Sequence, residues 1–248
     1  MTEDAPDAGP TRLNKHIAQT GFCSRREADR LIGERRVTVN GHPAGTGAVV
    51  GEGDVVLVDG QPLRARAVVK SSGRKHVYIV LNKPVGITCT TEASVKGNIV
   101  DFVGHEQRIF PIGRLDKESE GLILLTSNGD IVNQILRAEN RHEKEYLVEV
   151  NKPVTDEFLR AMAKGVRIHD QITLPCRTGR IAKFGFRIVL TQGLNRQIRL
   201  MAAAFGYRVT QLRRVRIDNV KLGPLKTGRW RNLTDAELRG LLPQMERW

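Results

Sequence analysis

Short, strand-like segments rich in apolar residues recur along residues 77–242, and polar, turn-forming segments separate them. A run of four to eight apolar residues with such flanks is typical of a strand that is buried on both faces. The pattern predicts strands at Val77–Leu81, Leu122–Thr126, Tyr146–Val150, Phe186–Leu190 and Arg208–Leu212.

Helical periodicity alternates with these runs. Apolar residues spaced three and four apart predict helices after Asp130, after Thr155 and after Asn195. Thr234 and Glu237 have the spacing of a capping box, which predicts one more helix near the end of the chain. Strands and helices interleave without a Gly-rich phosphate-binding loop, so we expect an α+β fold rather than a nucleotide-binding doubly wound fold.

The first sixty residues show a smaller pattern. Leu13 and Ile17 are four apart and predict a short helix. The segment Ser24–Glu27 reads as a capping box that opens a second helix. Strand-like alternation at Val37–Val39 is followed by an Asn-Gly pair, which is a strong signal for a hairpin turn.

These patterns divide the chain into four parts. Residues 1–10 are acidic, contain Pro and Gly, and are predicted to be disordered. Residues 11–61 form a small domain. Residues 62–76 lack periodicity and carry scattered positive charge, which is typical of a linker. Residues 77–248 form the larger domain.

Basic residues gather in two regions of a chain whose formal net charge is +13. Residues 191–231 contain ten Lys or Arg and one acid, and residues 10–44 contain seven basic and three acidic residues. Such a balance favours a polyanionic partner and predicts two RNA-contacting surfaces, the alternative being two solvated faces. The candidate contacts are Arg12, Lys15, Arg25, Arg26 and Arg30 in the first region, and Arg196, Arg213 and Arg214 in the second.

The chain shows no sign of a metal, disulfide or membrane protein. Cys23, Cys89 and Cys176 are far apart, and the six histidines share no ligand spacing. No run of about 18 apolar residues is present, and the acidic N-terminus does not read as a signal peptide. We therefore expect a cytoplasmic protein with reduced thiols and no bound metal.

A carboxylate in an unusual setting is the first candidate for chemistry. Asp116 lies in the polar loop Gly113–Gly121, directly before the apolar run that begins at Leu122. A loop residue at the mouth of a packed sheet is held rigidly, as catalytic groups require. By itself, the pattern also fits an ordinary turn aspartate. As a further alternative, Glu118, Glu120 and Asp130 could join Asp116 as oxygen ligands for Mg²⁺.

Three more segments favour a catalytic role for Asp116 over an ordinary turn aspartate. Together with the loop around Asp116, the segments Asn82–Gly86, Glu143–Val148 and Gly193–Arg199 resemble the Rsu-type branch of pseudouridine synthases, which act on ribosomal RNA. The segments SRREADRLI and VTVNG resemble an S-four-like RNA-binding domain. Within the branch, the order of segments is similar to the F type, which modifies large-subunit ribosomal RNA. The resemblance covers about residues 11–240.

The resemblance implies a fold and a reaction. The expected fold is α+β, with a small S-four-like domain joined to a catalytic domain that has a mixed, largely antiparallel sheet and a central cleft. The expected reaction isomerises uridine to pseudouridine without a cofactor, and Asp116 matches the catalytic carboxylate of the family. A compact carboxylate suits such chemistry because it can form a covalent intermediate.

The family's other site residues map onto this chain one by one. The resemblance implies that Tyr146 stacks on the target base, that Arg114 fills the gap left by the flipped base, and that Leu212 packs beneath the base. It also implies that Arg199 pairs with Asp116 and keeps that carboxylate ionised and oriented. Asn82-Lys83-Pro84 is expected to brace the floor of the cleft. Without the motif context, Tyr146 and Leu212 read as core residues, and the two arginines read as surface residues.

Two alternative functions stay open at this point. A non-catalytic RNA-binding or ribosome-assembly protein fits the first sixty residues equally well. The same chemistry on small-subunit ribosomal RNA or on a transfer RNA also fits, because site choice depends on the folded shape of the RNA. We expect a monomer in either case.

Overall fold

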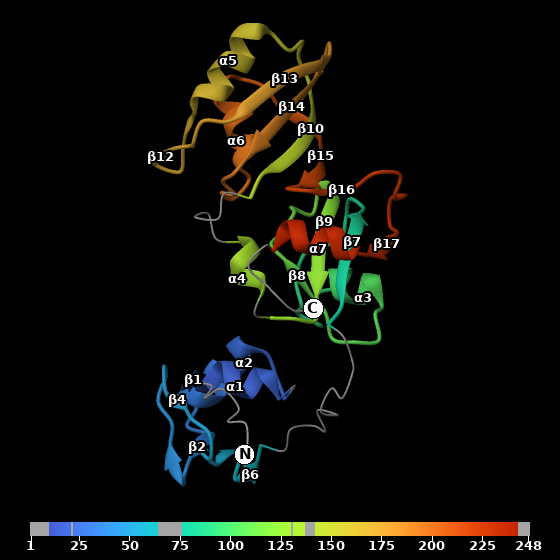
Figure 1. Cartoon of the computed structure of the whole chain (residues 1–248). Coiled ribbons are helices and arrows are strands. Elements are labelled where there is room, and N and C mark those ends of the chain that lie inside the picture. Colours follow the sequence, from blue (N-terminus) through green and yellow to red (C-terminus); the bar gives the residue numbers. More distant parts are fainter. Residues whose placement is uncertain (1–9, 21, 64–75, 130, 137–141, 243–248) are drawn as a thin grey trace, which may run out of the picture. The chain divides into compact units, whose positions relative to one another are not determined.

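The computed structural model describes the chain in five stretches: residues 10–20, 22–63, 76–129, 131–136 and 142–242. The chain divides into two compact units, residues 1–74 and 75–248 (Figure 1). Each unit has a hydrophobic core of its own. Within those five stretches, no helix is both long enough and apolar enough to cross a membrane.

The smaller unit consists of two short helices and several short strands. They are β1 (Thr11–Arg12), α1 (Leu13–Gln19), α2 (Arg25–Gly33), β2 (Val37–Val39), β3 (His42–Pro43), β4 (Val49–Val50), β5 (Val56–Val58) and β6 (Gln61–Pro62). Strands β3, β2, β5 and β6 form one sheet in that order, and β1 pairs with β4. Leu13 and Ile17 are fully buried in one cluster with Leu31 and Val37, so the four-residue spacing identified the buried face of α1.

Helix α2 begins as predicted, but only half of its capping box forms. The Ser24 hydroxyl accepts a hydrogen bond from the Glu27 N–H at 3.2 Å. The Glu27 carboxylate binds the Arg30 guanidinium, which also binds Glu34. A charged partner one turn along the helix competes better for Glu27 than the backbone does. Arg30, predicted to be available for phosphate, is therefore engaged in two ion pairs.

Two tight turns organise the small sheet. The predicted Asn40-Gly41 turn is confirmed, with φ of 51° and 83° at the two residues. Asp59 and Gly60, with φ of 52° and 73°, form a second turn that leads into β6. This turn was not predicted, because a partner strand of two residues shows no alternation. Pro62, predicted to open the linker, is therefore in the sheet, and residues 64–75 of the linker lie outside the described residues.

One sheet of nine strands organises the larger unit. The strands are β7 (Tyr78–Lys83), β8 (Phe110–Ile112), β9 (Glu120–Thr126), β10 (Lys144–Val150), β13 (Arg177–Ala182), β14 (Gly185–Leu190), β15 (Val209–Ile217), β16 (Val220–Lys221) and β17 (Trp230–Asn232). Their order is β13-β14-β10-β15-β9-β7-β17, with β16 beside β15 and β8 beside β9. All five predicted strands belong to this sheet, and the mixed, largely antiparallel sheet is confirmed. A separate hairpin joins β11 (Arg167–Ile168) to β12 (Gln171–Ile172).

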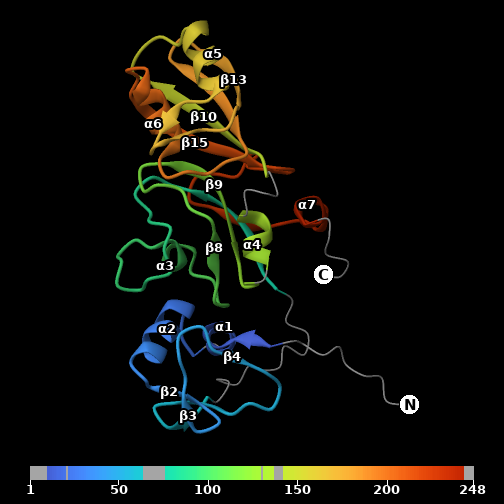
Figure 2. The ribbon, with the colours of Figure 1, turned by 90° about the vertical axis from the view of Figure 1, so that its left-hand side faces the viewer.

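Helices cover both faces of this sheet (Figure 2). They are α3 (Ile99–Val103), α4 (Ile131–Leu136), α5 (Asp156–Lys164), α6 (Gln197–Ala204) and α7 (Asp235–Leu241). Helices α3, α5 and α6 contribute to one buried cluster, and α4 and α7 contribute to the other. In β9, Ile123 and Leu125 belong to the first cluster, whereas Leu122 and Leu124 belong to the second. Burial on both faces explains why this strand is a continuous apolar run.

Strands β9 and β15 meet in a short parallel ladder. The ladder pairs Arg213 with Glu120 and Arg214 with Gly121. Gly121 has a φ of +103°, and a Cβ atom at this position would lie 2.2 Å from the Arg214 carbonyl oxygen. Glycine is therefore required for the two strands to approach each other.

Candidate active site

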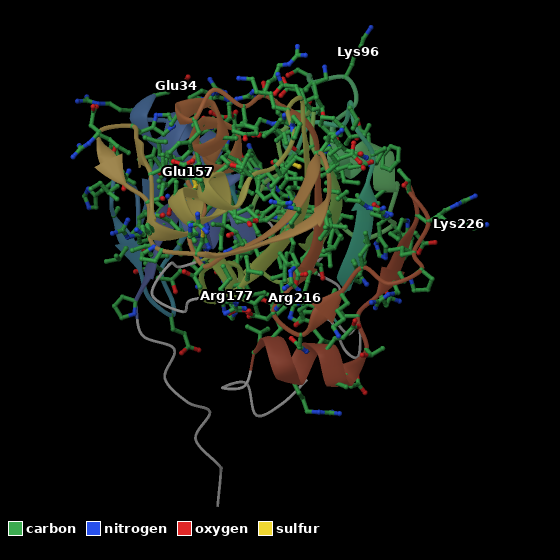
Figure 3. All side chains as sticks on the ribbon, turned by 90° about the horizontal axis from the view of Figure 1, so that it is seen from above. Glu34, Lys96, Glu157, Arg177, Arg216 and Lys226 are labelled. Carbon is green, nitrogen blue, oxygen red and sulfur yellow. The ribbon has the colours of Figure 1, made fainter. Side chains whose placement is uncertain are left out.

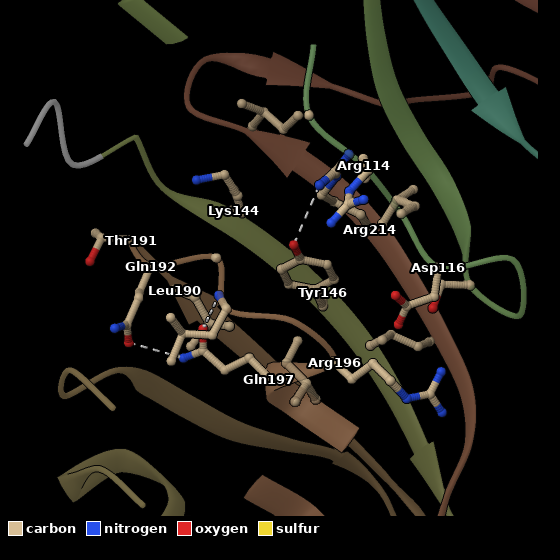
Figure 4. A pocket seen from close by; sticks show the side chains of 18 of the residues that line it. Arg114, Asp116, Lys144, Tyr146, Leu190, Thr191, Gln192, Arg196, Gln197 and Arg214 are labelled. Carbon is tan, nitrogen blue, oxygen red and sulfur yellow. Dashed lines mark hydrogen bonds between the residues drawn. The ribbon is translucent and has the colours of Figure 1, made fainter. Parts of the chain in front are cut away.

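A pocket of about 360 Å³ lies next to the parallel ladder. Its walls come from the segment between β8 and β9, from β10, from the segment between β14 and α6, and from β15. Figure 4 shows Asp116 at one end of this pocket, Lys144 and Gln192 at the other, and Tyr146 between them. A concave site lined by apolar, aromatic and convergent charged groups is the usual form of a ligand pocket.

The loop that carries Asp116 is anchored at several points. The Ser119 N–H donates to the Asp116 carbonyl oxygen at 3.0 Å, which closes a turn. The Gly86 N–H donates to the Lys117 carbonyl oxygen at 2.8 Å, and the Leu115 N–H donates to the Cys89 sulfur at 3.4 Å. These contacts hold the carboxylate at the mouth of the sheet.

Arg199 of α6 lies beside the Asp116 carboxylate. The Arg199 Nε atom is 3.9 Å from Asp116 Oδ2, and the two side chains are 13% and 28% exposed. Arg199 also donates to the Ser119 hydroxyl at 3.1 Å and to the Glu118 carbonyl oxygen at 3.3 Å. The guanidinium is therefore fixed by the loop itself and faces the carboxylate as an ion-pair partner across a distance too long for a hydrogen bond.

Tyr146 and Leu212 line the same pocket from neighbouring strands. Tyr146 is 9% exposed and Leu212 is 6% exposed. Strands β10 and β15 pair so that Val148 is opposite Leu212 and Tyr146 is opposite Arg214. An aromatic ring and an aliphatic side chain on one wall suit a flat, extruded base.

The predicted RNA-contacting arginines of this unit occupy different settings. Arg114 is exposed at the rim of the pocket. Arg196 is exposed and pairs with Glu118 at 3.0 Å. Arg213 is half-buried, and Arg214 is only 4% exposed and lies in the pocket wall rather than on the outer surface.

The oxygen ligands considered for Mg²⁺ have other partners. Glu118 binds Arg196, and Glu120 accepts a hydrogen bond from the Gln211 amide at 2.7 Å. Asp130 lies outside the described residues. In the part of the chain that the structure describes, no three His, Cys, Asp or Glu side chains form a metal-binding group.

Lys83 holds together the turn that follows β7. The side chain is fully buried, and its ammonium group donates to the carbonyl oxygens of Pro84 at 2.8 Å and Ile87 at 2.9 Å. Burial lowers the pKa of Lys83, and the charges of Cys89 and Asp116 oppose that shift. A buried cation that ties two carbonyl oxygens together shapes the turn that supports the Asp116 loop.

Lys144 and Gln197 are among the pocket residues that the sequence analysis did not predict. Lys144 lines the pocket two positions before Tyr146, and burial together with the charge of Arg214 lowers its pKa. Gln197 is 4% exposed, and its side-chain oxygen accepts a hydrogen bond from the Leu194 N–H at 3.0 Å. The period of two along β10 would have placed Lys144 beside Tyr146, whereas no local signal marks Gln197.

Not every arginine of the basic region 191–231 is available to RNA. Arg216 donates to Glu145 at 2.8 Å and to Glu143 at 3.1 Å. Arg177, which is labelled next to Arg216 in Figure 3, binds the same Glu143 at 2.9 Å. Hydrogen bonds from Arg177 and Arg216 hold the pKa of Glu143 below its ordinary value. Arg216 therefore helps to fix β10 against β15, and the count of basic residues overstates the charge offered to a polyanion.

In the smaller unit, the basic residues also fall into two groups. Arg12, Arg25 and Arg26 are exposed, and Arg25 and Arg26 form no ion pair with any described residue. Lys15 is half-buried and is not without an interaction partner. Arg30 forms ion pairs with Glu27 and Glu34. The first turn of α2 therefore carries two exposed arginines that have no ion-pair partner among the described residues.

Comparison with known proteins agrees with the fold. Residues 77–204 match the RNA pseudouridylate synthase family, and residues 11–56 match the S4 domain. The chain is 56% identical over 236 residues to the dual-specificity RNA pseudouridine synthase RluF of Salmonella typhi, covering 95% of this chain and 80% of that protein. It is 32% identical to the ribosomal large subunit pseudouridine synthase B of Bacillus subtilis, covering 93% and 95% of the two chains.

A solved structure supports the same family. The crystal structure of a pseudouridylate synthase superimposes with a TM-score of 0.68 at 28% sequence identity, covering 93% of this chain and 99% of that one. The chain belongs to the RNA pseudouridylate synthase family. It is an isomerase that converts uridine in RNA to pseudouridine, with an N-terminal S4 domain.

Proposed function

We propose that the enzyme isomerises a specific uridine of large-subunit (23S) ribosomal RNA, with Asp116 as the nucleophile and without a cofactor. The observation that carries the proposal is the placement of Asp116, held in an anchored loop beside Arg199 at one end of a pocket whose wall is Tyr146. The sequence similarity to a large-subunit pseudouridine synthase supports the choice of RNA.

The chemistry fits these groups. The reaction breaks the N1–C1′ bond of uridine, turns the detached uracil and joins C5 to C1′. The proton on C5 is lost and N1 gains one, so the reaction is redox-neutral. Asp116 supplies the nucleophilic carboxylate, and Arg199 holds its orientation. Tyr146 and Leu212 hold the flipped base, and Arg114 at the rim takes the place that the base leaves in the RNA stack.

The relatives described as dual-specificity enzymes favour a second RNA substrate as well. A transfer RNA is the second substrate that we propose. Both substrates would present a uridine in a folded loop, since the pocket accepts one base and leaves the rest of the RNA outside.

Mapping of pseudouridines tests both proposals. Total RNA from the source organism is compared with RNA from a strain that lacks the gene, and the strain is complemented with the wild-type protein or with Asp116→Asn. One 23S position and one transfer RNA position should lose pseudouridine, and only the wild-type protein should restore them. Loss confined to other RNAs would contradict the 23S assignment. An unchanged map would contradict the proposed RNA substrates altogether.

Replacing Tyr146 with phenylalanine separates stacking from hydroxyl chemistry. The ring remains, so RNA affinity should change less than about threefold, whereas the single-turnover rate should fall about 100-fold. The rate is measured as tritium released from RNA that carries [5-³H]uridine, because C5 loses its hydrogen when it joins C1′. A much weaker complex with an unchanged rate would make the hydroxyl a binding contact instead.

The smaller unit is proposed to supply affinity and placement. Changing Arg25 and Arg26 to glutamine should weaken RNA binding and reduce the slope of log affinity against log salt by roughly 1 to 2, because each released phosphate contact contributes about 0.7 to 0.9. The conversion rate at saturating enzyme should stay within about tenfold of the wild type.

A matched control has the same loss of charge. Arg30 and Arg36 are already paired with Glu27, Glu34 and Asp59. The double change of Arg30 and Arg36 to glutamine should therefore alter the salt slope by less than half as much. Equal slopes for the two double variants would show that total charge, and not the first turn of α2, governs RNA binding.

A further inference from the structure

The Arg214 guanidinium is a buried cation that lacks most of its hydrogen bonds. Arg214 is 4% exposed and lines the pocket. Its Nε–H donates to the Leu122 carbonyl oxygen at 2.7 Å, which fixes the side chain against β9. Its Nη2 atom is covered and has no hydrogen-bond partner among the described residues. Its Nη1 atom lies 3.5 Å from the Tyr146 hydroxyl oxygen.

Burying an arginine without a full set of hydrogen bonds costs free energy of folding, which indicates that this residue has a functional role. Arginine keeps its charge under all ordinary conditions and carries only donors. Lys83 and Lys144 lie close enough for the charge of Arg214 to lower the pKa of each. A fold that needed only a packed residue opposite Tyr146 would be more stable with an apolar side chain there.

The contact with Tyr146 has a defined direction. Arg214 has no acceptor atom, so Nη1–H donates and the phenol oxygen accepts. The Tyr146 hydroxyl hydrogen must then point away from the guanidinium. The strand pairing reinforces this arrangement, because Tyr146 and Arg214 are directly opposite each other in β10 and β15, with the guanidinium carbon 5.9 Å from the ring centre.

We propose that Arg214 is a positioning residue, which orients the Tyr146 hydroxyl so that its hydrogen is donated into the pocket, to an oxygen atom of the flipped uridine. The 3.5 Å contact shortens when the nucleotide fills the pocket, as active-site hydrogen bonds commonly do when substrate binds. Donation by Arg214 also makes the phenol a stronger donor, because hydrogen bonds in a chain polarise one another. This inference rests on the proposed role of Tyr146 in the reaction.

A double-mutant cycle between Arg214 and Tyr146 tests the proposal. The single-turnover rate of tritium release is measured at saturating enzyme for the wild type, Tyr146→Phe, Arg214→Met and the variant with both changes. The probe is [5-³H]uridine-labelled RNA from the strain that lacks the gene. Arg214→Met should lower the rate about 10- to 100-fold. The rate of the double variant should lie within about threefold of the rate of the slower single variant, because both changes remove the same interaction.

Two further variants keep the test decisive. Arg214→Lys retains the charge and much of the packing. Its rate should be higher than that of Arg214→Met only when Tyr146 is present. It replaces Arg214→Met in the cycle if Arg214→Met does not fold. Arg180→Met removes an exposed arginine from β13 of the same sheet and should leave the rate unchanged. Thermal unfolding of each variant shows whether the sheet is intact.

The outcomes separate the inference from the proposed function. If the effects of folded Arg214 and Tyr146 variants multiply, Arg214 acts independently of the hydroxyl and the inference is wrong. If Tyr146→Phe alone keeps the full rate, the role of Tyr146 is wrong and the inference falls with it. If the wild type releases no tritium from this RNA, the proposed substrate is wrong.

Discussion

Replacing Asp116 with asparagine should lower pseudouridine formation by at least about 10⁴-fold, because the amide keeps the size of the side chain and loses its nucleophilicity. The loop should keep its shape, since its anchors are the backbone contacts of Leu115, Lys117 and Ser119. Thermal unfolding and RNA affinity should therefore stay close to the wild-type values. The rate is followed by tritium release in a single turnover, with enzyme in excess over RNA.

Glu118→Gln is the matched control for this experiment. Glu118 is in the same loop, its side chain is 61% exposed, and it pairs with Arg196. The change removes the second carboxylate that lies 3.9 Å from the Arg199 Nε atom and leaves Asp116 in place, so the rate should fall less than about fivefold. More than one per cent residual activity in Asp116→Asn would remove the carboxylate from the proposed mechanism.

The largest effect on stability is expected for Gly121→Ala. A Cβ atom there would lie 2.2 Å from the Arg214 carbonyl oxygen and 2.8 Å from its backbone nitrogen, and the φ of +103° is one that alanine rarely adopts. Backbone atoms have little room to retreat, so β9 and β15 must separate. We expect a loss of about 4 kcal/mol or more in the free energy of unfolding, which corresponds to a melting temperature lower by roughly 10 °C.

Gly179→Ala gives the comparison within the same sheet. A Cβ atom at Gly179 in β13 would meet nothing within 4 Å, and its φ is not in the left-handed region. This change should alter the free energy of unfolding by less than about 1 kcal/mol. Urea denaturation followed by circular dichroism measures both variants. Equal stability of the two would contradict the close approach of β9 and β15.

The sequence predicted the central strands well because both faces of them are covered. In β9, adjacent apolar residues belong to different buried clusters, which leaves a continuous run in the sequence. The helix starts at Thr155 and Thr234 were also predictable, since each threonine hydroxyl accepts a backbone N–H three residues on. Local chemistry of this kind is visible in one sequence.

Edge strands were not predicted, for the opposite reason. Strand β13 is mostly exposed and reads as a polar segment, and β17 is three residues at the other edge of the sheet. The strand predicted at Arg208–Leu212 continues to Ile217, because the basic run after Leu212 alternates between the pocket and the opposite face. A run of arginines is typical of a surface, and only the pairing with β9 and β10 shows otherwise.

The residues of the candidate site also differ in how well the sequence predicts their places. Asp116 and Tyr146 were found through motifs in the sequence, and the structure places both in one pocket. Arg214 was predicted as an RNA contact, because an arginine is usually solvated. Its burial depends on a parallel ladder between β9 and β15, strands more than eighty residues apart in the chain. No local pattern reports such a pairing.

The ladder between β9 and β15 also separates the site into two parts. It joins only two pairs of residues, whereas β10 pairs with β15 along seven positions and β7 with β9 along six. Asp116 belongs to the β9 side of this seam, and Tyr146 belongs to the β10 side. Along the strand order β13-β14-β10-β15-β9-β7-β17, this seam has the fewest paired residues, so a bending load applied by a large RNA concentrates there. A change in the width of this seam would change the spacing between the Asp116 carboxylate and the Tyr146 ring.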